Sequence, residues 1–289
     1  MSGLIMVTGA TGGLGGDVLD FLLKRVPAER LAGLARKPED LAHLAERGVT
    51  VRQGDYDDPD SLVAAFRGVD KLLLVSAKSF TDAKTAHRNV IRAAKEAGVR
   101  HIHYTAIQRR PGSAFVLPQV TEWDEYTENE LTASGLDVTV LRNSQYLEAF
   151  DMLIGAITPD RVVRVPVGDT PIALATRGDM AEATAAVLAS DGHEGRSYTL
   201  TGSKSFTLAD YTDVVGEITG SPVTHEQISA EDYIGRLLDA GTPDQWAPFL
   251  AAWFQAMEAG EFSPGDDVER LIGRPTTSLR SVVAQRRAS

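Results

Sequence analysis

The sequence predicts an α/β fold with a doubly wound parallel sheet and a smaller, mostly helical C-terminal lobe. Over residues 1–143, short apolar runs alternate with stretches of helical periodicity. This alternation is typical of a parallel sheet with helices on both faces. Beyond residue 143 the alternation fades and helical patterns dominate. We therefore expect a sheet domain over 1–143 and a lobe over 144–289, part of which returns to the main sheet.

Six apolar runs are expected to form the strands of the first domain. They are Leu4–Val7, Leu31–Ala35, Val49–Arg52, Lys71–Val75, His101–Tyr104 and Val138–Leu141. Gly98 follows a helical pattern, as a C-terminal cap glycine does. The stretch Gln108–Val120 is rich in proline and glycine, so we expect a loop. Loops that follow parallel strands line the ligand crevice of open sheets, which makes this loop a candidate for substrate contact.

Beyond residue 143, four helices and one strand are expected. The helices are Asp179–Leu188, Leu208–Ile218, Glu231–Leu238 and Gln245–Met257, and the strand is Arg196–Leu200. The last helix carries an apolar stripe that includes Trp253, with the spacing of a packed helix face. We interpret the stripe as core or interface, with one edge facing substrate at Trp253. An interface there would make the protein a homodimer.

Composition excludes several classes of protein. The chain has 289 residues, no cysteine, and 40 acidic against 29 basic residues, a net charge of −11. Without cysteine, disulfides, thiol catalysis and cysteine-ligated metals are excluded. His101 and His103 share one strand face but have no third ligand at a convincing spacing, so we predict no metal site. The acidic balance argues against nucleic acid and anionic membrane as partners. No apolar run reaches the roughly 18 residues of a membrane span, and the N-terminus lacks a basic leader, so we expect a cytoplasmic protein with a small-molecule substrate.

A glycine-rich turn is the strongest chemical signal. Gly9, Gly12 and Gly15 have G-x-x-G-x-x-G spacing after the first strand and at the start of the first helix. A phosphate-binding turn needs glycine where the chain bends and where backbone approaches the ligand, and the following helix presents free N–H groups. The alternative is a plain glycine-rich turn. The expected cofactor contacts are Gly9, Thr11, Gly12, Gly13, Leu14 and Gly15.

Two further strand ends bear on the cofactor. The second strand is followed by Arg36 and Lys37 and not by an acidic residue. An arginine there suits the 2′-phosphate of NADPH, so we predict NADPH over NADH; the alternative is a solvated basic pair. Asp55 follows the third strand and is expected to accept the adenine amino group, unless it caps the next turn.

Eight stretches carry a family resemblance over nearly the whole chain. They are Thr8–Gly15, Val51–Leu62, Lys71–Ser76, His87–Thr105, Leu141–Asn143, Thr176–Ala181, Gly192–Tyr198 and Leu271–Leu279. Together they resemble the atypical, NmrA-like branch of the short-chain dehydrogenase/reductase superfamily. Within it, the likeness is to bacterial NADPH-dependent quinone oxidoreductases and triphenylmethane-dye reductases.

The resemblance implies a Rossmann domain that binds NADPH at the glycine turn, with Arg36 on the 2′-phosphate. It places Asp55 and Tyr56 beside adenine. Further cofactor contacts are implied at Ser76, Ala77, Tyr104 and Thr105, the last two near the nicotinamide. Substrate is implied between the strand ends and the C-terminal lobe, near Asn143, Gln145 and Tyr146.

The superfamily's usual acid is absent. Most members carry Tyr-x-x-x-Lys, in which the lysine tunes a tyrosine that protonates the product. Here the corresponding positions hold Asp124 and Glu128, and Ala106 replaces the usual serine. Tyr126 and Glu130 have the dyad spacing, but a glutamate disfavours a phenolate. The catalytic candidates are therefore Tyr126, Asp124 and Glu128, against the alternatives of a solvated acidic helix face and a surface tyrosine.

We hypothesise an NADPH-dependent reductase that transfers hydride to a quinone-like or other conjugated electrophile. Such an acceptor delocalises the incoming charge and takes its proton from water, so the protein mainly positions it. One alternative is a non-catalytic regulatory protein that senses NADP(H). Another is a non-redox isomerase or cyclase, with Asp124 and Glu128 as the acid/base pair.

Overall fold

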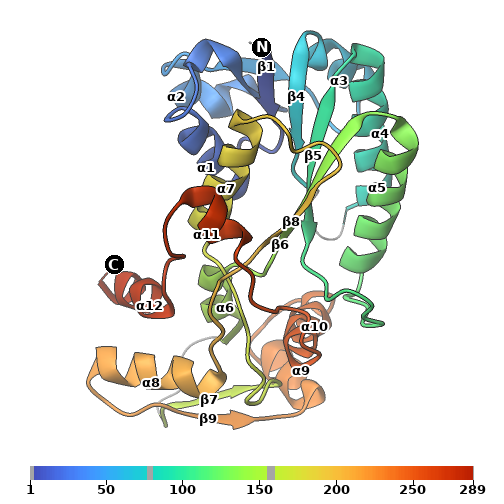
Figure 1. Ribbon diagram of the computed structural model, residues 1–289. Helices are drawn as coiled ribbons and strands as arrows, with labels where there is room; N and C mark the ends of the chain where they lie inside the picture. Colours follow the sequence, from blue (N-terminus) through green and yellow to red (C-terminus); the bar gives the residue numbers. More distant parts are fainter. Residues whose placement is uncertain (1–2, 77–80, 155–159, 289) are drawn as a thin grey trace. The chain divides into compact units, whose positions relative to one another are not determined.

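The computed structural model describes residues 3–76, 81–154 and 160–288, which form two compact units (Figure 1). The first consists of Met1–Ile107, Gln119–Asn143 and Arg177–Thr199. The second consists of Gln108–Pro118, Ser144–Thr176 and Leu200–Ser289. Among the described residues, no helix has the length and apolar character that crossing a membrane requires.

A seven-stranded sheet, counted over the described residues, forms the centre of the first unit, in the order β3-β2-β1-β4-β5-β6-β8. Its strands are β1 (Leu4–Val7), β2 (Leu31–Ala35), β3 (Thr50–Gln53), β4 (Val69–Leu74), β5 (His101–Ile107), β6 (Asp137–Asn143) and β8 (Ser197–Leu200). The pairings from β3 to β6 are all parallel. Hydrogen bonds run from Val140 N–H to Arg196 O and from Ser144 N–H to Leu200 O. The residue numbers increase in the same direction on both segments, so β8 is parallel to β6. The predicted fold class is confirmed.

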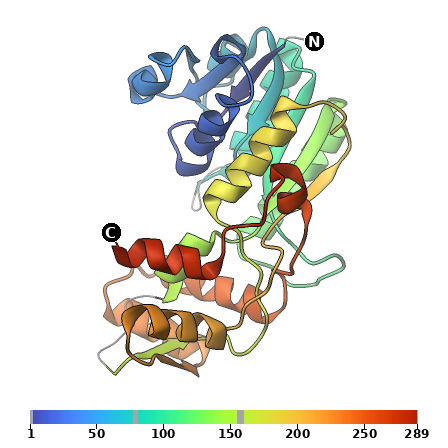
Figure 2. The ribbon, with the colours of Figure 1, turned by 60° about the vertical axis from the view of Figure 1, so that its left-hand side comes forward.

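Helices cover both faces of this sheet (Figures 1 and 2). On one face, α1 (Gly13–Leu22) packs against α7 (Arg177–Ala189). On the other, α4 (Ala83–Ala97) packs between α3 (Pro59–Phe66) and α5 (Val120–Ser134). The short α2 (Ala42–Ala45) precedes β3. Apolar side chains of β1, β4, β5 and the three-helix layer form a continuous buried core.

The helix α4 shows how the sequence produces this layer. Val90, Ile91 and Ala94 are buried and recur at helical spacing. Asp82 accepts from the backbone N–H of Thr85 at the start of the helix. The helix ends at Gly98, whose φ of 79° is left-handed, which confirms the predicted cap glycine.

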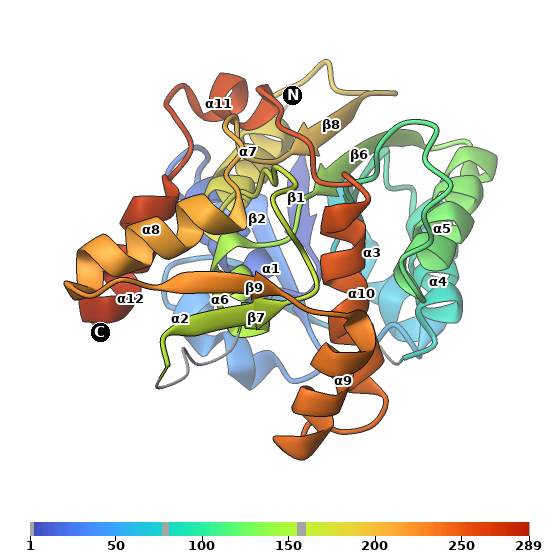
Figure 3. The ribbon, with the colours of Figure 1, turned by 90° about the horizontal axis from the view of Figure 1, so that it is seen from below.

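The second unit is mostly helical, with a small parallel sheet (Figure 3). Its elements are α6 (Leu147–Ile154), β7 (Val162–Val165), α8 (Leu208–Thr219), β9 (Thr224–Gln227), α9 (Ala230–Asp239), α10 (Trp246–Glu258), α11 (Asp267–Ile272) and α12 (Leu279–Ala288). Phe150 is fully buried and makes edge contacts with Phe206, Tyr211 and Phe254.

The predicted apolar stripe lies on α10 and packs inside this unit. Phe249 and Trp253 are nearly buried, and Phe254 and Met257 are fully buried. Because the unit itself covers the stripe, the stripe gives no argument for a second copy, and a homodimer stays a prediction. The pair β7–β9 was not predicted, because each strand has only four residues. Arg164 interrupts the apolar run of β7, and β9 contains no apolar residue.

A buried lysine joins β4 to the end of α7. Lys71 lies in the middle of β4 and is 6% exposed. Its Nζ donates to the carbonyl oxygens of Leu188 (3.2 Å) and Ser190, and pairs with Asp191 at 3.0 Å. The last carbonyls of a helix lack partners within the helix, so this lysine supplies donors that the end of α7 requires.

We therefore expect Lys71→Met to lower the free energy of unfolding by about 1–3 kcal/mol, because it leaves buried carbonyl groups unpaired. Asp191→Asn is the matched control. Its side chain is exposed, so we expect a loss below about 1 kcal/mol. Equilibrium unfolding in urea measures both. Equal stability of Lys71→Met and wild type would contradict this role.

Candidate functional site

The glycine-rich turn connects β1 to α1 by a close backbone contact. Gly9 has a left-handed φ of 58°, and its carbonyl oxygen accepts from the N–H of Gly12 at 2.9 Å. A Cβ at Gly15 would lie 2.4 Å from that same oxygen. Only glycine therefore allows α1 to start this close to β1. Thr11, Gly12 and Gly13 are exposed at the turn, whereas Leu14 is buried beneath it.

The start of α1 has the features of an anion site. Its N-cap, Gly12, has no side chain to accept from the first-turn N–H groups, and the first turn contains no acidic residue. These donors have no intrahelical acceptor, and the helix dipole favours a negative group there. The residues present therefore fit the phosphates of a dinucleotide.

Arg177, at the start of α7, lies against this turn. Its Nη1 would be 2.8 Å from a Cβ at Gly13, and its Nε pairs with Asp17 of α1 at 2.7 Å. It adds a cation beside the helix terminus, partly balanced by Asp17. No motif in the sequence pointed to a role for Arg177. The stretch Thr176–Ala181 that contains it was only part of the family resemblance.

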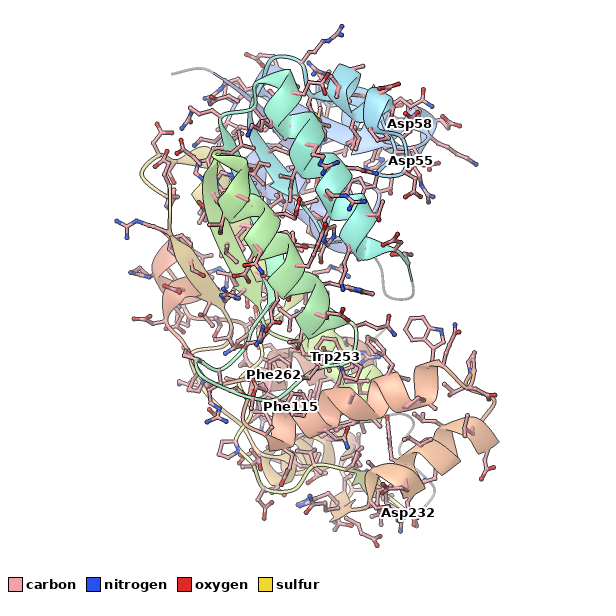
Figure 4. The ribbon with its side chains drawn as sticks, turned by 90° about the vertical axis from the view of Figure 1, so that its right-hand side faces the viewer. Asp55, Asp58, Phe115, Asp232, Trp253 and Phe262 are labelled. Carbon is pink, nitrogen blue, oxygen red and sulfur yellow. The ribbon has the colours of Figure 1, made fainter. Side chains whose placement is uncertain are left out.

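The ends of β2 and β3 provide the next candidates. Arg36 follows β2 and is exposed. Asp58, rather than Asp55, caps α3 by accepting from the N–H of Ser61 at 3.2 Å (Figure 4). Asp55 instead accepts from the N–H of Asp57 at 3.2 Å within its own turn. Asp55 therefore does cap the turn that follows β3, as the alternative expected, and its contact with adenine stays a prediction.

Tyr56 joins the ends of β1 and β4. Its hydroxyl lies 2.5 Å from Thr8 Oγ1 and 3.0 Å from the carbonyl oxygen of Val75. Thr8 Oγ1 in turn donates to Leu73 O and accepts from the Val75 N–H. Burial raises the pKa of Tyr56 far above its ordinary value. The tyrosine hydroxyl thus fixes the strand ends from which a cofactor site is built.

Ser76 and Thr105 connect β4 to β5 in the same way. The N–H of Ser76 donates to the buried Thr105 Oγ1 at 3.0 Å. Ala77, the next candidate in the sequence, lies outside the described residues.

Tyr104 and Asp124 form a buried pair between β5 and α5. The Tyr104 hydroxyl donates to Asp124 Oδ1 at 2.7 Å, and the Ile107 N–H donates to Asp124 Oδ2 at 2.8 Å. Tyr104 is fully buried and Asp124 is 3% exposed. Burial raises the pKa of Asp124 to about 6, and burial and the nearby carboxylate raise the pKa of Tyr104 well above its usual range. The alternative of a solvated acidic face is therefore wrong for Asp124.

The three catalytic candidates do not converge. Glu128, one turn after Asp124, pairs with Arg142 of β6 through two 2.7 Å bonds. Tyr126 lies on another face of α5, half-buried, with its ring 5.8 Å from Lys84 Nζ of α4. Asp124 and Glu128 therefore face the sheet, and Tyr126 faces α4.

The expected substrate residues have varied surroundings. Asn143, at the end of β6, is buried, and its Oδ1 has no hydrogen-bond partner among the described residues. Gln145 and Tyr146 are half-buried just before α6, where Tyr146 bridges to Ala175. Trp253 is 9% exposed and stacks on Phe262 at 6.1 Å between ring centroids.

The paired histidines of β5 pack together in the sheet. The rings of His101 and His103 are buried and stacked with centroids 4.0 Å apart. Burial lowers the pKa of His101 to about 4. The described residues contain no group of three or more side chains arranged to hold a metal ion.

The fold and the glycine turn define a Rossmann-type dinucleotide-binding protein. The chain belongs to the NmrA-like family, whose model matches residues 1–284. It is 39% identical to quinone oxidoreductase 2 of Escherichia coli over 284 residues, which cover 97% of this chain and 98% of that protein.

Two solved structures extend the comparison. The NADPH-dependent quinone oxidoreductase of Escherichia coli, complexed with NADPH, matches with a TM-score of 0.91 and 37% identity over 98% of this chain and 99% of that one. The Citrobacter sp. triphenylmethane reductase complexed with NADP(H) matches with a TM-score of 0.91 and 35% identity over 97% and 99%. The resemblance inferred from the sequence is confirmed.

The burial of Asp124 has a measurable consequence for stability. Its pKa is near its ordinary value in the unfolded chain and about 6 in the folded chain, so the folded state binds the proton more tightly. Stability from this group is fully present below about pH 4 and is lost as pH rises through about 6. We expect wild type to lose about 3 kcal/mol relative to Asp124→Asn between about pH 3 and pH 7.

Urea unfolding of both proteins across this pH range tests the expectation. The difference between them should level off above about pH 7. A difference that does not change with pH would contradict the shifted pKa.

Proposed function

We propose that this protein reduces quinone-like or other conjugated electrophiles by hydride transfer from NADPH. The observation that carries the proposal has two parts. The dinucleotide-binding turn is complete, and the two residues at the positions of the superfamily's proton-donating pair are already hydrogen-bonded within the protein. The turn at Gly9–Gly15 and the uncapped start of α1 fit a dinucleotide. At the positions of the missing Tyr-x-x-x-Lys pair, Asp124 and Glu128 are engaged by protein partners.

The protein is an NADPH-dependent oxidoreductase. The first turn of α1 and Arg177 favour the pyrophosphate, and the exposed Arg36 would bind the 2′-phosphate. When bound, NADPH supplies a hydride, so that quinone, NADPH and one proton give hydroquinone and NADP⁺. The contribution of the chain is to bind and orient the reactants.

The hydrogen bonds that engage Asp124 and Glu128 support a conjugated acceptor, because such an acceptor needs no proton donor from the protein. An ordinary ketone becomes an alkoxide, which needs a tuned proton donor in the site. One oxygen of Asp124 accepts from the Tyr104 hydroxyl and the other from the Ile107 N–H, and Glu128 pairs with Arg142. A quinone becomes a delocalised anion that water can protonate. The same contacts weigh against an isomerase or cyclase that uses Asp124 and Glu128 as its acid and base.

The decisive experiment follows NADPH oxidation with a quinone, a triphenylmethane dye and a simple ketone. We expect turnover with the first two and little with the third. Gly15→Ala should abolish both NADPH binding and turnover, because its Cβ would collide with backbone. Gly16→Ala is the matched control, since its Cβ would lie 3.4 Å from its nearest contact.

Other outcomes have clear meanings. Binding of NADPH without oxidation by any acceptor would favour a regulatory NADP(H) sensor. Conversion of a substrate without consumption of NADPH would favour the non-redox alternative. Turnover of the simple ketone at the quinone rate would contradict our account of the missing acid.

Arg36 determines the choice of cofactor in this proposal. We expect Arg36→Ala to weaken NADPH binding by about 10- to 100-fold, because it removes a charge-assisted contact to the 2′-phosphate, and to leave NADH binding nearly unchanged. Titration calorimetry with each cofactor measures this. The adjacent Lys37→Ala is the control and should have the smaller effect. Parallel losses for both cofactors would show that Arg36 does not read the phosphate.

A further inference from the structure

A buried glutamate holds the loop that follows β5. Glu261 is 3% exposed, and both its carboxylate oxygens accept from the segment Gln108–Pro118. The N–H of Arg110 donates to Oε2 at 2.9 Å, and the Ser113 hydroxyl donates to Oε1. A buried carboxylate is costly unless charge-assisted bonds satisfy it, so these contacts define the conformation of the loop.

The backbone of Glu261 is itself rigidly placed. Gly260 has a left-handed φ of 72°, and its N–H donates to Met257 O. The N–H of Glu261 donates to Ala256 O, which completes a Schellman motif at the end of α10. The next residue, Phe262, is buried and stacks on Trp253. The anchor and the aromatic stack therefore belong to one fixed segment.

The contacts continue from the anchor to the tip of the loop. Ser113 Oγ, which donates to Glu261, also accepts from the N–H of Phe115 at 3.1 Å. At the base of the loop, Gln108 Nε2 donates to Ser263 O at 2.8 Å. The loop is thus tied at both Gln108 and Ser113 to the segment Glu261–Ser263.

The tip that these contacts display is apolar. Phe115 is half-buried and Val116 is 62% exposed, which makes Val116 the more exposed of two large hydrophobic side chains on the surface of the described residues. An exposed aliphatic side chain contributes no hydrophobic free energy to folding. An apolar ligand that covers it gains free energy by removing that surface from water. Figure 4 labels the aromatic residues Phe115, Trp253 and Phe262 of this region.

We propose that Glu261 is a positioning residue for the acceptor: it fixes the loop so that Phe115 and Val116 form part of the surface that binds the conjugated substrate. The proposal rests on the proposed function, because it takes the flat, apolar acceptor of that reaction as the ligand. In this proposal the buried Glu261 acts on the acceptor only through the loop that it holds.

One peptide bond reports directly on this anchor. Trypsin can cut between Arg109 and Arg110, and the N–H of that bond is the one that Glu261 accepts. The next arginine bond is blocked by Pro111. We expect Glu261→Gln to accelerate cleavage after Arg109 by about tenfold or more, because loss of the charged acceptor favours local opening. Mass spectrometry of the fragments identifies the bond.

Kinetics test the link to the acceptor. We expect Glu261→Gln to raise the quinone KM by about fivefold or more while kcat and NADPH affinity change less than twofold. Ser113→Ala removes half of the anchor and should show smaller shifts in the same direction. Phe115→Ala should raise the quinone KM without accelerating cleavage. A merely structural role for Glu261 would instead lower stability and affect all of these quantities together.

The matched control is Glu258→Gln. Glu258 ends the same helix, but it accepts from Gly168 N–H and Thr170 Oγ1 and does not hold the loop. It should leave both cleavage after Arg109 and the quinone KM unchanged. If Glu261→Gln does not accelerate that cleavage, the anchor is disproved; if it does so without raising the quinone KM, the acceptor role is disproved.

Failure of the proposed function remains distinguishable. If wild type reduces no acceptor, the cleavage assay still measures the anchor, and a soluble naphthoquinone serves as the probe of binding. Slower cleavage of wild type after Arg109 in its presence, lost in Phe115→Ala, would support the apolar surface. Unchanged cleavage would overturn it.

Discussion

The close contact between Gly15 and the carbonyl oxygen of Gly9 is the constraint on which the site depends. It lets α1 start directly after β1, so that the helix terminus lies at the carboxyl end of β1, beside β4, where the strand order of the sheet reverses direction. Any side chain at Gly15 would push the helix away. The first-turn N–H groups, and Arg177 beside Gly13, then occupy positions that suit phosphate.

This local arrangement reconciles a polyanionic ligand with an acidic protein. The chain carries a net charge of −11, yet the first turn of α1 has no acidic side chain. Helix N–H groups and Arg177 supply positive potential over a short distance, where solvent screening matters least.

Buried carboxylates hold backbone N–H groups in both units. Asp124 accepts from the N–H of Ile107 in the first unit, and Glu261 accepts from the N–H of Arg110 in the second. Along the chain, these two anchors hold consecutive parts of the segment that leaves β5. A buried carboxylate with both oxygens satisfied by hydrogen bonds constrains the backbone geometry of the segment that it holds.

The sequence by itself determined the fold class, the glycine turn and the approximate strand positions, because periodicity and glycine spacing are local signals. The strands β5 and β6 extend to Ile107 and Asn143, beyond the expected Tyr104 and Leu141, since ladder hydrogen bonds rather than apolar side chains define their ends. The hydrogen-bond partners of the polar side chains could not be predicted from the sequence.

Only the tertiary structure decided which groups the polar candidate residues contact. Asp124 was a catalytic candidate or part of a solvated face in the sequence, and it became a buried partner of Tyr104. Arg177 and Glu261 gave no local signal, because their contacts at Gly13 and Ser113 lie far away along the chain. A hydrogen bond depends on distance in space, which packing of the whole chain determines and local sequence does not.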